Sequence, residues 1–552
     1  MSKLNRNRFR APNHKSTLAG SILAGLLVPL AMACPHLSAA TLSLRGASAY
    51  PLLSGAIQQS DSGGLNASNA KPTGVSAANL PKEESSTTEH TFLFRGQKIP
   101  YRATASTLLL KNDKGEPIGL MYSVAYTRSD VSDPSRRPVA FLYNGGPGSA
   151  SMWLHLGAFG PKRVQLNGTN AIPPAPYKLV DNEDSLLDKT DLVFIDAMGT
   201  GYSRAIGKGH NADFYGTDGD ALAFAQFIHT YLSRYNRWNS PKFLIGESYG
   251  TFRSAAVADY LKSKYSTDLN GIVLISSVLN LSTITFSPAN ISPCIFYLPS
   301  YAAVAWYHKT LKQQPSDLTA FVDEARNYAK GEYAAALFQG AQLPAAEKET
   351  VAKKLTYFTG IDEDYWLKAN LCTSDGKFDA EVLRAEGKSV ASLDARFAGY
   401  DYDRLTERSQ TDPLEDGIES AFTSLLNQYN HNELKFGMDE NYNNSRIDGH
   451  GWNWKRASSH GFPSAPQTVS DLALTMISNP HLLVQVENGY FDLATPFFAT
   501  EFTMNHLGIP PELQKNINLD YYKSGHMIYL QDEAHRQLHD NIARFIDRAT
   551  EQ

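Results

Sequence analysis

The stretch FLIGESYGTF (residues 243–252) carries polar side chains at the point where one kind of secondary structure gives way to another. Its apolar first half is typical of a buried strand, and the residues after the second glycine are compatible with a helix. Gly246, Ser248 and Gly250 match the pattern G-x-S-x-G in the strand–turn–helix context that gives this pattern its meaning. A serine on such a turn stands clear of the sheet, and the glycines relieve the crowding around it. We therefore expect Ser248 to act as a nucleophile.

The groups that would activate this serine follow later in the chain. A serine hydroxyl needs a base to react at neutral pH, and with this type of turn an acid and then a histidine come after the serine. Asp492 in ENGYFDLATP and His526 in KSGHMIYL each follow an apolar run that is typical of a strand. We therefore predict a catalytic triad of Ser248, His526 and Asp492. Asp196 is a rival acid, but it precedes the serine, which is the wrong order for this type of fold.

A glycine-rich turn supplies the third requirement, a site for the oxyanion that develops during acyl transfer. The segment FLYNGGPGSAS (residues 141–151) ends another apolar run, at a place where such folds present a backbone N–H. We expect the N–H groups of Gly146 and of Tyr249, the residue after the nucleophile, to form the oxyanion hole. A purely structural turn is the alternative interpretation of Gly-Gly-Pro-Gly.

Short apolar runs with a glycine nearby recur along the chain, in PVAFLYNGG, DLVFIDAMG, KFLIGES and GIVLISSV. Helical stretches separate them, which is the pattern of buried parallel strands that alternate with helices. The pattern is lost between residues 281 and 470, and it resumes in HLLVQVENG. We therefore predict an α/β fold with a mostly parallel central sheet in two parts, residues 91–280 and 471–552, and a large, mainly helical lid insertion at 281–470.

The first ninety residues predict no folded domain. Residues 1–40 combine basic residues, an apolar run and a small-residue SAA site, as in a cleaved signal peptide. Residues 41–90 are rich in Ser, Ala, Gly and Asn and predict a disordered or low-complexity linker. We therefore expect export to the periplasm or the extracellular medium; a retained membrane anchor and a lipoprotein attached through Cys34 are the alternatives. The sequence leaves open whether Cys294 and Cys372 pair.

The composition argues against several kinds of partner. The 552 residues have a formal net charge of −5, and nothing in their distribution favours a nucleic-acid partner. After the first forty residues, no stretch is long and apolar enough to span a bilayer. The fifteen histidines show no metal-binding spacing, and the sequence contains no phosphate loop or dinucleotide fingerprint. We therefore predict no metal, no other cofactor and no membrane span in the mature protein.

Several of these motifs together resemble those of a known family. The blocks are NGGPGS (144–149), FIDAMGTGYS (194–203), GESYG (246–250), NGYFD (488–492) and GHM (525–527). In combination they are similar to the serine carboxypeptidases of the carboxypeptidase Y type, which are α/β-hydrolases. The resemblance implies the same triad and the same oxyanion donors as the residues themselves do.

The resemblance also implies a role for the acid beside the nucleophile. In that family, residues at the positions of Asn144 and Glu247 hydrogen-bond the free C-terminal carboxylate of the substrate, and the N–H of Gly145 assists. A carboxylic acid can do this only when it is protonated, because two carboxylates in contact repel each other and the pKa of one of them rises.

The sequence departs from the family pattern near this site. Ala158 stands where the family has a second glutamate, Ser149 replaces a cysteine, and the disulfides of the family are missing. We therefore expect a weaker preference for acidic pH than is usual in the family. The function that we expect is an exported serine carboxypeptidase acting on peptides with a free C-terminus through an acyl-enzyme. The alternatives are an esterase or acyltransferase with the same triad, and a non-catalytic binding protein on the same fold.

Overall fold

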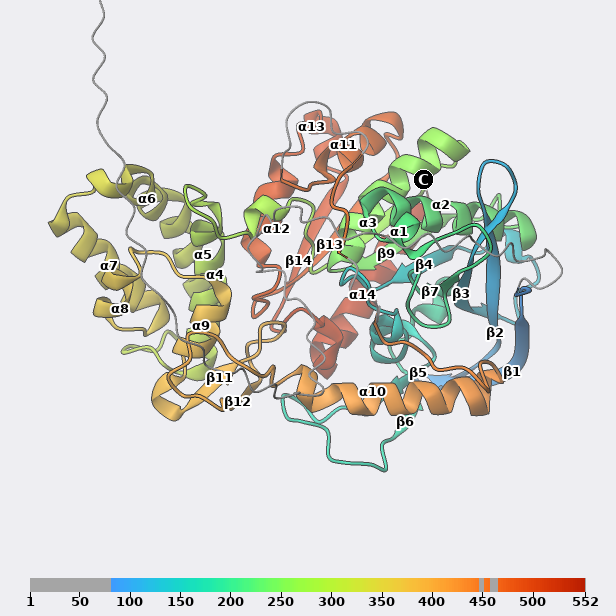
Figure 1. Cartoon of the computed structure of the whole chain (residues 1–552), viewed down its shortest axis with the longest axis horizontal. Helices are drawn as coiled ribbons and strands as arrows, with labels where there is room; N and C mark the ends of the chain where they lie inside the picture. The colour runs from blue at the N-terminus through green and yellow to red at the C-terminus, as the bar shows by residue number, and fades with distance from the viewer. Residues whose placement is uncertain (1–80, 446–450, 457–464, 552) are drawn as a thin grey trace, which may run out of the picture. The chain divides into compact units, whose positions relative to one another are not determined.

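A 10-stranded sheet forms the centre of the protein, which is described here from a computed structural model for residues 81–445, 451–456 and 465–551. The strands follow one another across the sheet in the order β1-β2-β3-β7-β4-β9-β10-β13-β14, and β8 pairs with β3 outside this path (Figure 1). Their bounds are β1 Ser85–Phe94, β2 Gln97–Lys111, β3 Pro117–Arg128, β4 Val139–Tyr143, β7 Asp191–Ile195, β8 Arg204–Ala205, β9 Lys242–Glu247, β10 Gly271–Ile275, β13 Leu483–Gly489 and β14 Ile517–Tyr522.

The strands from β7 to β14 in this order are parallel neighbours, whereas β1, β2 and β3 pair antiparallel at one side of the sheet. Parallel strands need long crossover connections, and helices supply most of them here. The predicted α/β fold with a mostly parallel sheet is confirmed. The core was expected to start at residue 91, but β1 begins at Ser85, because residues 85–94 pair along the whole of the first half of β2. The predicted signal peptide and residues 41–80 lie outside the described residues.

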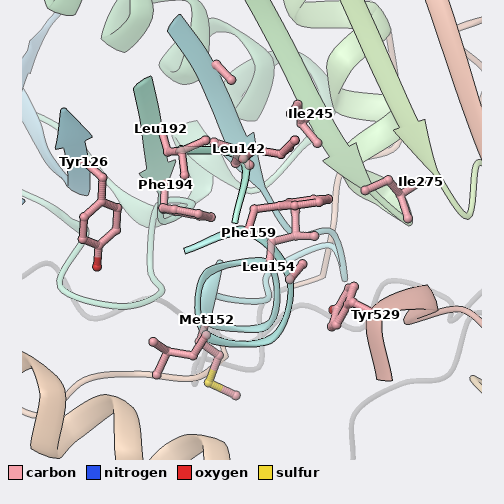
Figure 2. Packing of buried hydrophobic residues seen from close by; sticks show 14 of the residues in the cluster. Tyr126, Leu142, Met152, Leu154, Phe159, Leu192, Phe194, Ile245, Ile275 and Tyr529 are labelled. Atoms are coloured by element: carbon pink, nitrogen blue, oxygen red, sulfur yellow. The ribbon is translucent and has the colours of Figure 1, made fainter. Parts of the chain in front are cut away.

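Side chains of each parallel strand alternate between two buried layers, as the period of two in a strand requires. In β4, Ala140 and Leu142 point into one layer, and Val139, Phe141 and Tyr143 point into the other. Helices α2 (Thr217–Arg234) and α3 (Tyr249–Tyr265) cover the second layer, and α14 (Asp532–Thr550) covers the first. Figure 2 shows the first layer near the strand ends, where Phe159 and Leu154 lie close to Leu142. Both faces of the sheet are therefore shielded from water, which explains why its strands are almost continuously apolar.

Helices fill the segment between β10 and β13, as expected for an insertion. They are α4 Ser292–His308, α5 Leu318–Tyr328, α6 Ala334–Gln339, α7 Ala345–Thr359, α8 Glu363–Lys368, α9 Asp375–Glu381, α10 Glu415–Tyr429 and α11 Val469–Ser478. Helices α4, α5, α7 and α8 pack on one another around a core of their own (Figure 1). Helix α10 instead joins the layer beneath the sheet through residues such as Ile418 and Phe422. No helix of the described residues is long and apolar enough to cross a membrane.

A disulfide joins Cys294 to Cys372, with 5.3 Å between their Cα atoms and a separation of 78 positions in the chain. It connects α4 to the segment between α8 and α9 and therefore crosslinks the first part of the helical insertion to its middle. The sequence left this pairing open, because two cysteines far apart in the chain do not reveal their distance in space.

Replacing both cysteines by alanine should destabilise the insertion. Closing a loop of this length restricts the unfolded chain, and loss of such a crosslink costs about 2–4 kcal/mol of unfolding free energy. We expect the insertion to unfold at a lower temperature and a lower urea concentration in the double variant, measured by calorimetry and by tryptophan fluorescence. Wild-type protein in a strong reductant is the matched control and should show the same loss. An unchanged transition in both samples would contradict the prediction.

Candidate active site

Four predicted site residues follow the carboxyl ends of neighbouring parallel strands. Asn144 comes directly after β4 and Ser248 directly after β9, while Asp492 and His526 lie a few residues after β13 and β14. The carboxyl ends of parallel strands meet at one edge of a sheet, and ligand sites of open α/β sheets form there. The topology therefore brings these residues, which lie at positions 144, 248, 492 and 526 of the chain, to the same edge.

Ser248 lies on a strained turn between β9 and α3. Its backbone has φ 61° and ψ −130°, a combination that non-glycine residues rarely adopt. The Ser248 N–H donates a hydrogen bond to the Ile275 carbonyl over 3.0 Å, which ties the turn to the neighbouring strand. The turn leaves no room at Gly246, where a Cβ would lie 2.4 Å from the Gly250 carbonyl oxygen. The serine side chain is partly exposed, as a nucleophile requires.

The His526 ring is buried and oriented by Asp492. His526 Nδ1 lies 2.8 Å from Asp492 Oδ2, and this contact assigns the proton to Nδ1 and leaves Nε2 as the acceptor. The other carboxylate oxygen, Oδ1, accepts the N–H groups of Ala494 and Thr495 over 2.9 and 2.8 Å. Burial lowers the pKa of His526, but the charge and hydrogen bond of Asp492, together with the charge of Glu247, more than offset this, and the pKa lies above its usual value.

Contacts through β10 link the serine turn to the histidine loop. The Ser276 hydroxyl donates to the His526 carbonyl over 2.6 Å, while the preceding residue, Ile275, accepts the Ser248 N–H. Glu247, directly before Ser248, interacts electrostatically with both His526 and Asp492. The three residues of the predicted triad therefore belong to one connected site.

The glycine-rich loop after β4 packs tightly against the serine turn. A Cβ on Gly145 would lie 2.4 Å from the Tyr249 backbone nitrogen and 2.8 Å from the Glu247 carbonyl oxygen. Gly146 has φ +105°, a conformation that favours glycine. The Ser149 N–H closes the loop by donating to the Gly145 carbonyl over 3.1 Å. This close approach places the predicted oxyanion donors, Gly146 and Tyr249, on two backbone segments in van der Waals contact.

Asn144 and Glu247 form a buried pair beside the nucleophile. Asn144 Nδ2 donates to Glu247 Oε1 over 2.9 Å, and Asn144 Oδ1 accepts the Leu154 N–H over 3.0 Å, which fixes the orientation of the amide. Both side chains are 3% exposed. Burial raises the pKa of Glu247 to about 7, because the carboxylate loses more hydration than its neighbours replace. The site thus holds an acid that exists in both protonation states near neutrality.

Asp196, the rival acid, has other partners. Its Oδ1 accepts the Ser151 N–H over 2.8 Å and its Oδ2 accepts the Tyr442 hydroxyl over 2.7 Å. These contacts support the loop that follows the glycine-rich turn. Asp492, and not Asp196, is therefore the acid that contacts the His526 ring.

The chain also resembles known proteins in its sequence. The sequence matches the family model described as "Serine carboxypeptidase" over residues 119–528, which is more than half of the chain. The chain belongs to the serine carboxypeptidase family. No curated protein matched in a search of such sequences.

The solved structures that resemble this serine carboxypeptidase are distant from it in sequence. The prohormone-processing carboxypeptidase KEX1(delta)p from Saccharomyces cerevisiae is 16% identical, with a TM-score of 0.48, over 81% of this chain and 91% of that chain. A proline iminopeptidase from Mycobacterium smegmatis is 12% identical, with a TM-score of 0.34, over 81% of this chain and 98% of that chain.

Two residues of this serine carboxypeptidase were not found from its sequence, although they contact the site directly. The Thr495 hydroxyl lies 2.7 Å from Asp492 Oδ2 and 3.1 Å from His526 Nδ1, so it helps to hold the carboxylate and the ring. The Arg253 guanidinium is buried, donates to the Asn144 carbonyl over 2.6 Å, and pairs with Asp220. A threonine three residues after the acid was a detectable signal, whereas nothing in the sequence connects Arg253 with Asn144.

A Gly145→Ala variant should lose activity while it still folds. The added Cβ meets backbone atoms that cannot rotate away, so the loop must shift and withdraw an oxyanion donor. We expect kcat to fall by about 10²- to 10³-fold, the usual cost of losing one such donor. Gly331→Ala is the matched control, because no atom lies within 4 Å of a Cβ at that position. Wild-type activity of Gly145→Ala would show that the contact does not position the loop.

Proposed function

We propose that this serine carboxypeptidase is exported and removes C-terminal residues from peptides through an acyl-enzyme. The observation that carries the proposal is the buried Asn144–Glu247 pair directly beside the partly exposed Ser248. A hydrolase that acts within a chain, or on an ester, has no use for a protonatable acid at this place. An enzyme that recognises a free C-terminus needs donors for a carboxylate close to the scissile bond.

In this mechanism Ser248 is the nucleophile and His526 the general base. Nε2 of His526 accepts the serine proton as the hydroxyl attacks the scissile carbonyl, and it then delivers the proton to the departing amine. Asp492 holds the ring through Nδ1 and stabilises the imidazolium that forms. Water then attacks the acyl-enzyme with the same histidine as base and releases the shortened peptide.

The N–H groups of Gly146 and Tyr249 stabilise the oxyanion of each tetrahedral intermediate. Tyr249 is the first residue of α3, whose N-terminus adds a favourable field for negative charge. Gly145 lets the loop approach the turn closely enough for both donors to face one atom. Because the backbone is held before substrate arrives, little reorganisation is needed during the reaction.

Asn144, Glu247 and the Gly145 N–H bind the terminal carboxylate of the substrate. Glu247 can donate to it only in the protonated form, which predominates below its pKa of about 7. Above that pH, two carboxylates would face each other and substrate binding would weaken. Peptide hydrolysis therefore depends on a proton that ester hydrolysis does not need.

Export is supported by the disulfide between Cys294 and Cys372, because such bonds persist in oxidising compartments. The signal peptide proposed for residues 1–40 would direct the chain there, and its removal is a separate, testable event. N-terminal sequencing of the secreted protein identifies the cleavage site and separates this route from anchoring through Cys34.

The purified mature protein should shorten a blocked peptide from its C-terminus and spare the C-terminally amidated form of the same peptide. The amide lacks the charge that Asn144 and Glu247 recognise, so we expect kcat/KM to be at least about 100-fold lower for it, as for a lost hydrogen-bonded charge. Mass spectrometry of both digests measures the difference, and Ser248→Ala is the control that should abolish both activities.

Other outcomes of this experiment identify the alternative functions. Equal rates on the free and amidated peptides, together with rapid hydrolysis of esters, would indicate an esterase or acyltransferase. A protein whose activities all survive Ser248→Ala would be a binding protein on the same fold.

Replacing Glu247 by glutamine should remove the alkaline decline of peptide hydrolysis. In the wild type we expect kcat/KM to fall as the pH rises through about 7, where Glu247 loses its proton. Glutamine has nearly the same shape and donates at every pH, so this fall should disappear. The Glu247 charge also raises the pKa of His526. In the variant, the loss of kcat/KM that follows protonation of His526 at acidic pH (the acid limb of the profile) should therefore move to lower pH.

The measurement is a pH profile of kcat/KM over roughly pH 5 to 9 for a free-acid peptide, with a blocked ester as control. Because an ester needs no proton on Glu247, its rate of hydrolysis should depend only on the protonation of His526. The same alkaline decline in the wild type and in Glu247→Gln would contradict the assignment of this limb to Glu247.

A further inference from the structure

Tyr529 is a buried tyrosine that lies next to the proposed carboxylate site. It belongs to the short helical turn η10 (Ile528–Leu530), directly after the histidine loop, and its side chain is fully buried. The ring packs on the helical turn η3 (Leu154–Phe159), where a Cβ on Gly157 would lie only 2.7 Å from a ring carbon. Figure 2 shows Tyr529 beside this turn. Glycine at position 157 thus leaves the space that the ring occupies.

Two buried polar atoms of this cluster have no well-formed hydrogen bond. The Tyr529 hydroxyl and Glu247 Oε2 are both buried, and neither forms a hydrogen bond of good geometry among the described residues. The hydroxyl nevertheless lies close enough to the carboxyl to interact with it. Buried polar atoms are almost always satisfied in folded proteins, so two orphans side by side next to a nucleophile indicate a place where a ligand atom binds.

Asn144 joins the same cluster. Its Nδ2 donates one hydrogen to Glu247 Oε1 and interacts with the Tyr529 hydroxyl. Because Oδ1 is occupied by the Leu154 N–H, the amide cannot flip, and its donors stay directed to this side. Ala158, on the neighbouring turn, offers only its carbonyl oxygen, which already accepts from Asn182 and His535.

We propose that the Tyr529 hydroxyl binds the terminal carboxylate of the substrate together with Asn144 and Glu247. This inference rests on the proposed function, since it assigns one more binding group to the same site. The hydroxyl has two tasks: it donates to one carboxylate oxygen of the substrate, and it directs the second oxygen towards the Glu247 proton. No covalent bond changes at Tyr529 during the reaction.

The chemistry of a phenol suits this position. Burial and the neighbouring Glu247 raise the pKa of Tyr529 well above its usual value, so the hydroxyl keeps its proton and remains a donor throughout the working range. A second carboxyl at this place would add another acidic proton and another charge. With tyrosine at this place, Glu247 is the acid of this cluster that titrates near neutral pH.

A Tyr529→Phe variant tests the proposal. It removes the unpartnered hydroxyl and keeps the ring that fills the space beside Gly157, so the fold should be preserved. For a blocked peptide with a free C-terminus we expect kcat/KM to fall about 10- to 100-fold, mainly through a higher KM, as for one lost hydrogen bond to a charged group. Hydrolysis of a blocked ester should stay within about two-fold of wild type, because an ester without a free carboxylate does not use this hydroxyl.

The pH profile supplies a second readout that a merely structural role would not change. The Tyr529 hydroxyl lowers the pKa of Glu247, so its removal should raise that pKa and move the alkaline limb of peptide hydrolysis to higher pH. Tyr101→Phe is the matched control, because Tyr101 is also buried with an unpartnered hydroxyl but lies on strand β2. It should leave both the rates and the profile unchanged.

Binding measurements separate this inference from the proposed function. The Ser248→Ala protein, with and without Tyr529→Phe, is titrated calorimetrically with an N-acetyl dipeptide as the free acid and as the amide. The proposal predicts that, without the Tyr529 hydroxyl, the free-acid dipeptide binds more weakly and the amidated dipeptide binds as before. That result would stand even if the wild type hydrolysed no peptide, in which case only the proposed function would fail. Unchanged binding of the acid, or an equal loss on acid, amide and ester, would overturn the role of Tyr529.

Discussion

The parallel pairing of strands β7, β4, β9, β10, β13 and β14 is the constraint on which the rest of the site depends. Because these strands run in one direction, the chain leaves all of them at the same edge of the sheet. Asn144, Ser248, Asp492 and His526 therefore become neighbours although a long insertion separates the first two from the last two. The strained backbone of Ser248 is held there by its hydrogen bond to β10.

Burial at this edge controls the protonation of its acids. Arg253 pairs with Asp220, and Asp492 accepts two backbone N–H groups. Glu247 accepts a side-chain hydrogen bond from the neutral amide of Asn144 and forms no ion pair among the described residues. Desolvation therefore dominates at Glu247 and brings its pKa close to 7. Glu247, directly beside the nucleophile, can therefore carry a proton near neutral pH.

The helical insertion is connected to this edge through its own core. The buried cluster that contains α4, α5 and α7 also includes Tyr249, directly after the nucleophile, and Phe491, directly before Asp492. Packing of the insertion and positioning of the site are consequently coupled. The disulfide between Cys294 and Cys372 ties the first helix of this cluster to a later segment and limits how far the insertion can unfold by itself.

The sequence by itself determined the α/β class, the serine turn and the order of the candidate site residues. These features are local, because strand and helix periods, glycine at a tight turn and residues following a strand are visible in short windows. The residues proposed for the triad and the oxyanion hole were named in this way, whereas those proposed for carboxylate binding came from the resemblance to a family. The start of β1 at Ser85 was not found, since that polar segment becomes a strand only by pairing with β2.

Only the tertiary structure decided which side chains meet. Asp196 accepts hydrogen bonds from Ser151 and Tyr442. Cys294 pairs with Cys372. Thr495, Arg253 and Tyr529 lie around the site. The tertiary structure also set the protonation of Glu247, which depends on the water excluded by residues from several strands and turns. Contacts and burial of this kind arise between segments far apart in the chain, so no short window of sequence contains them.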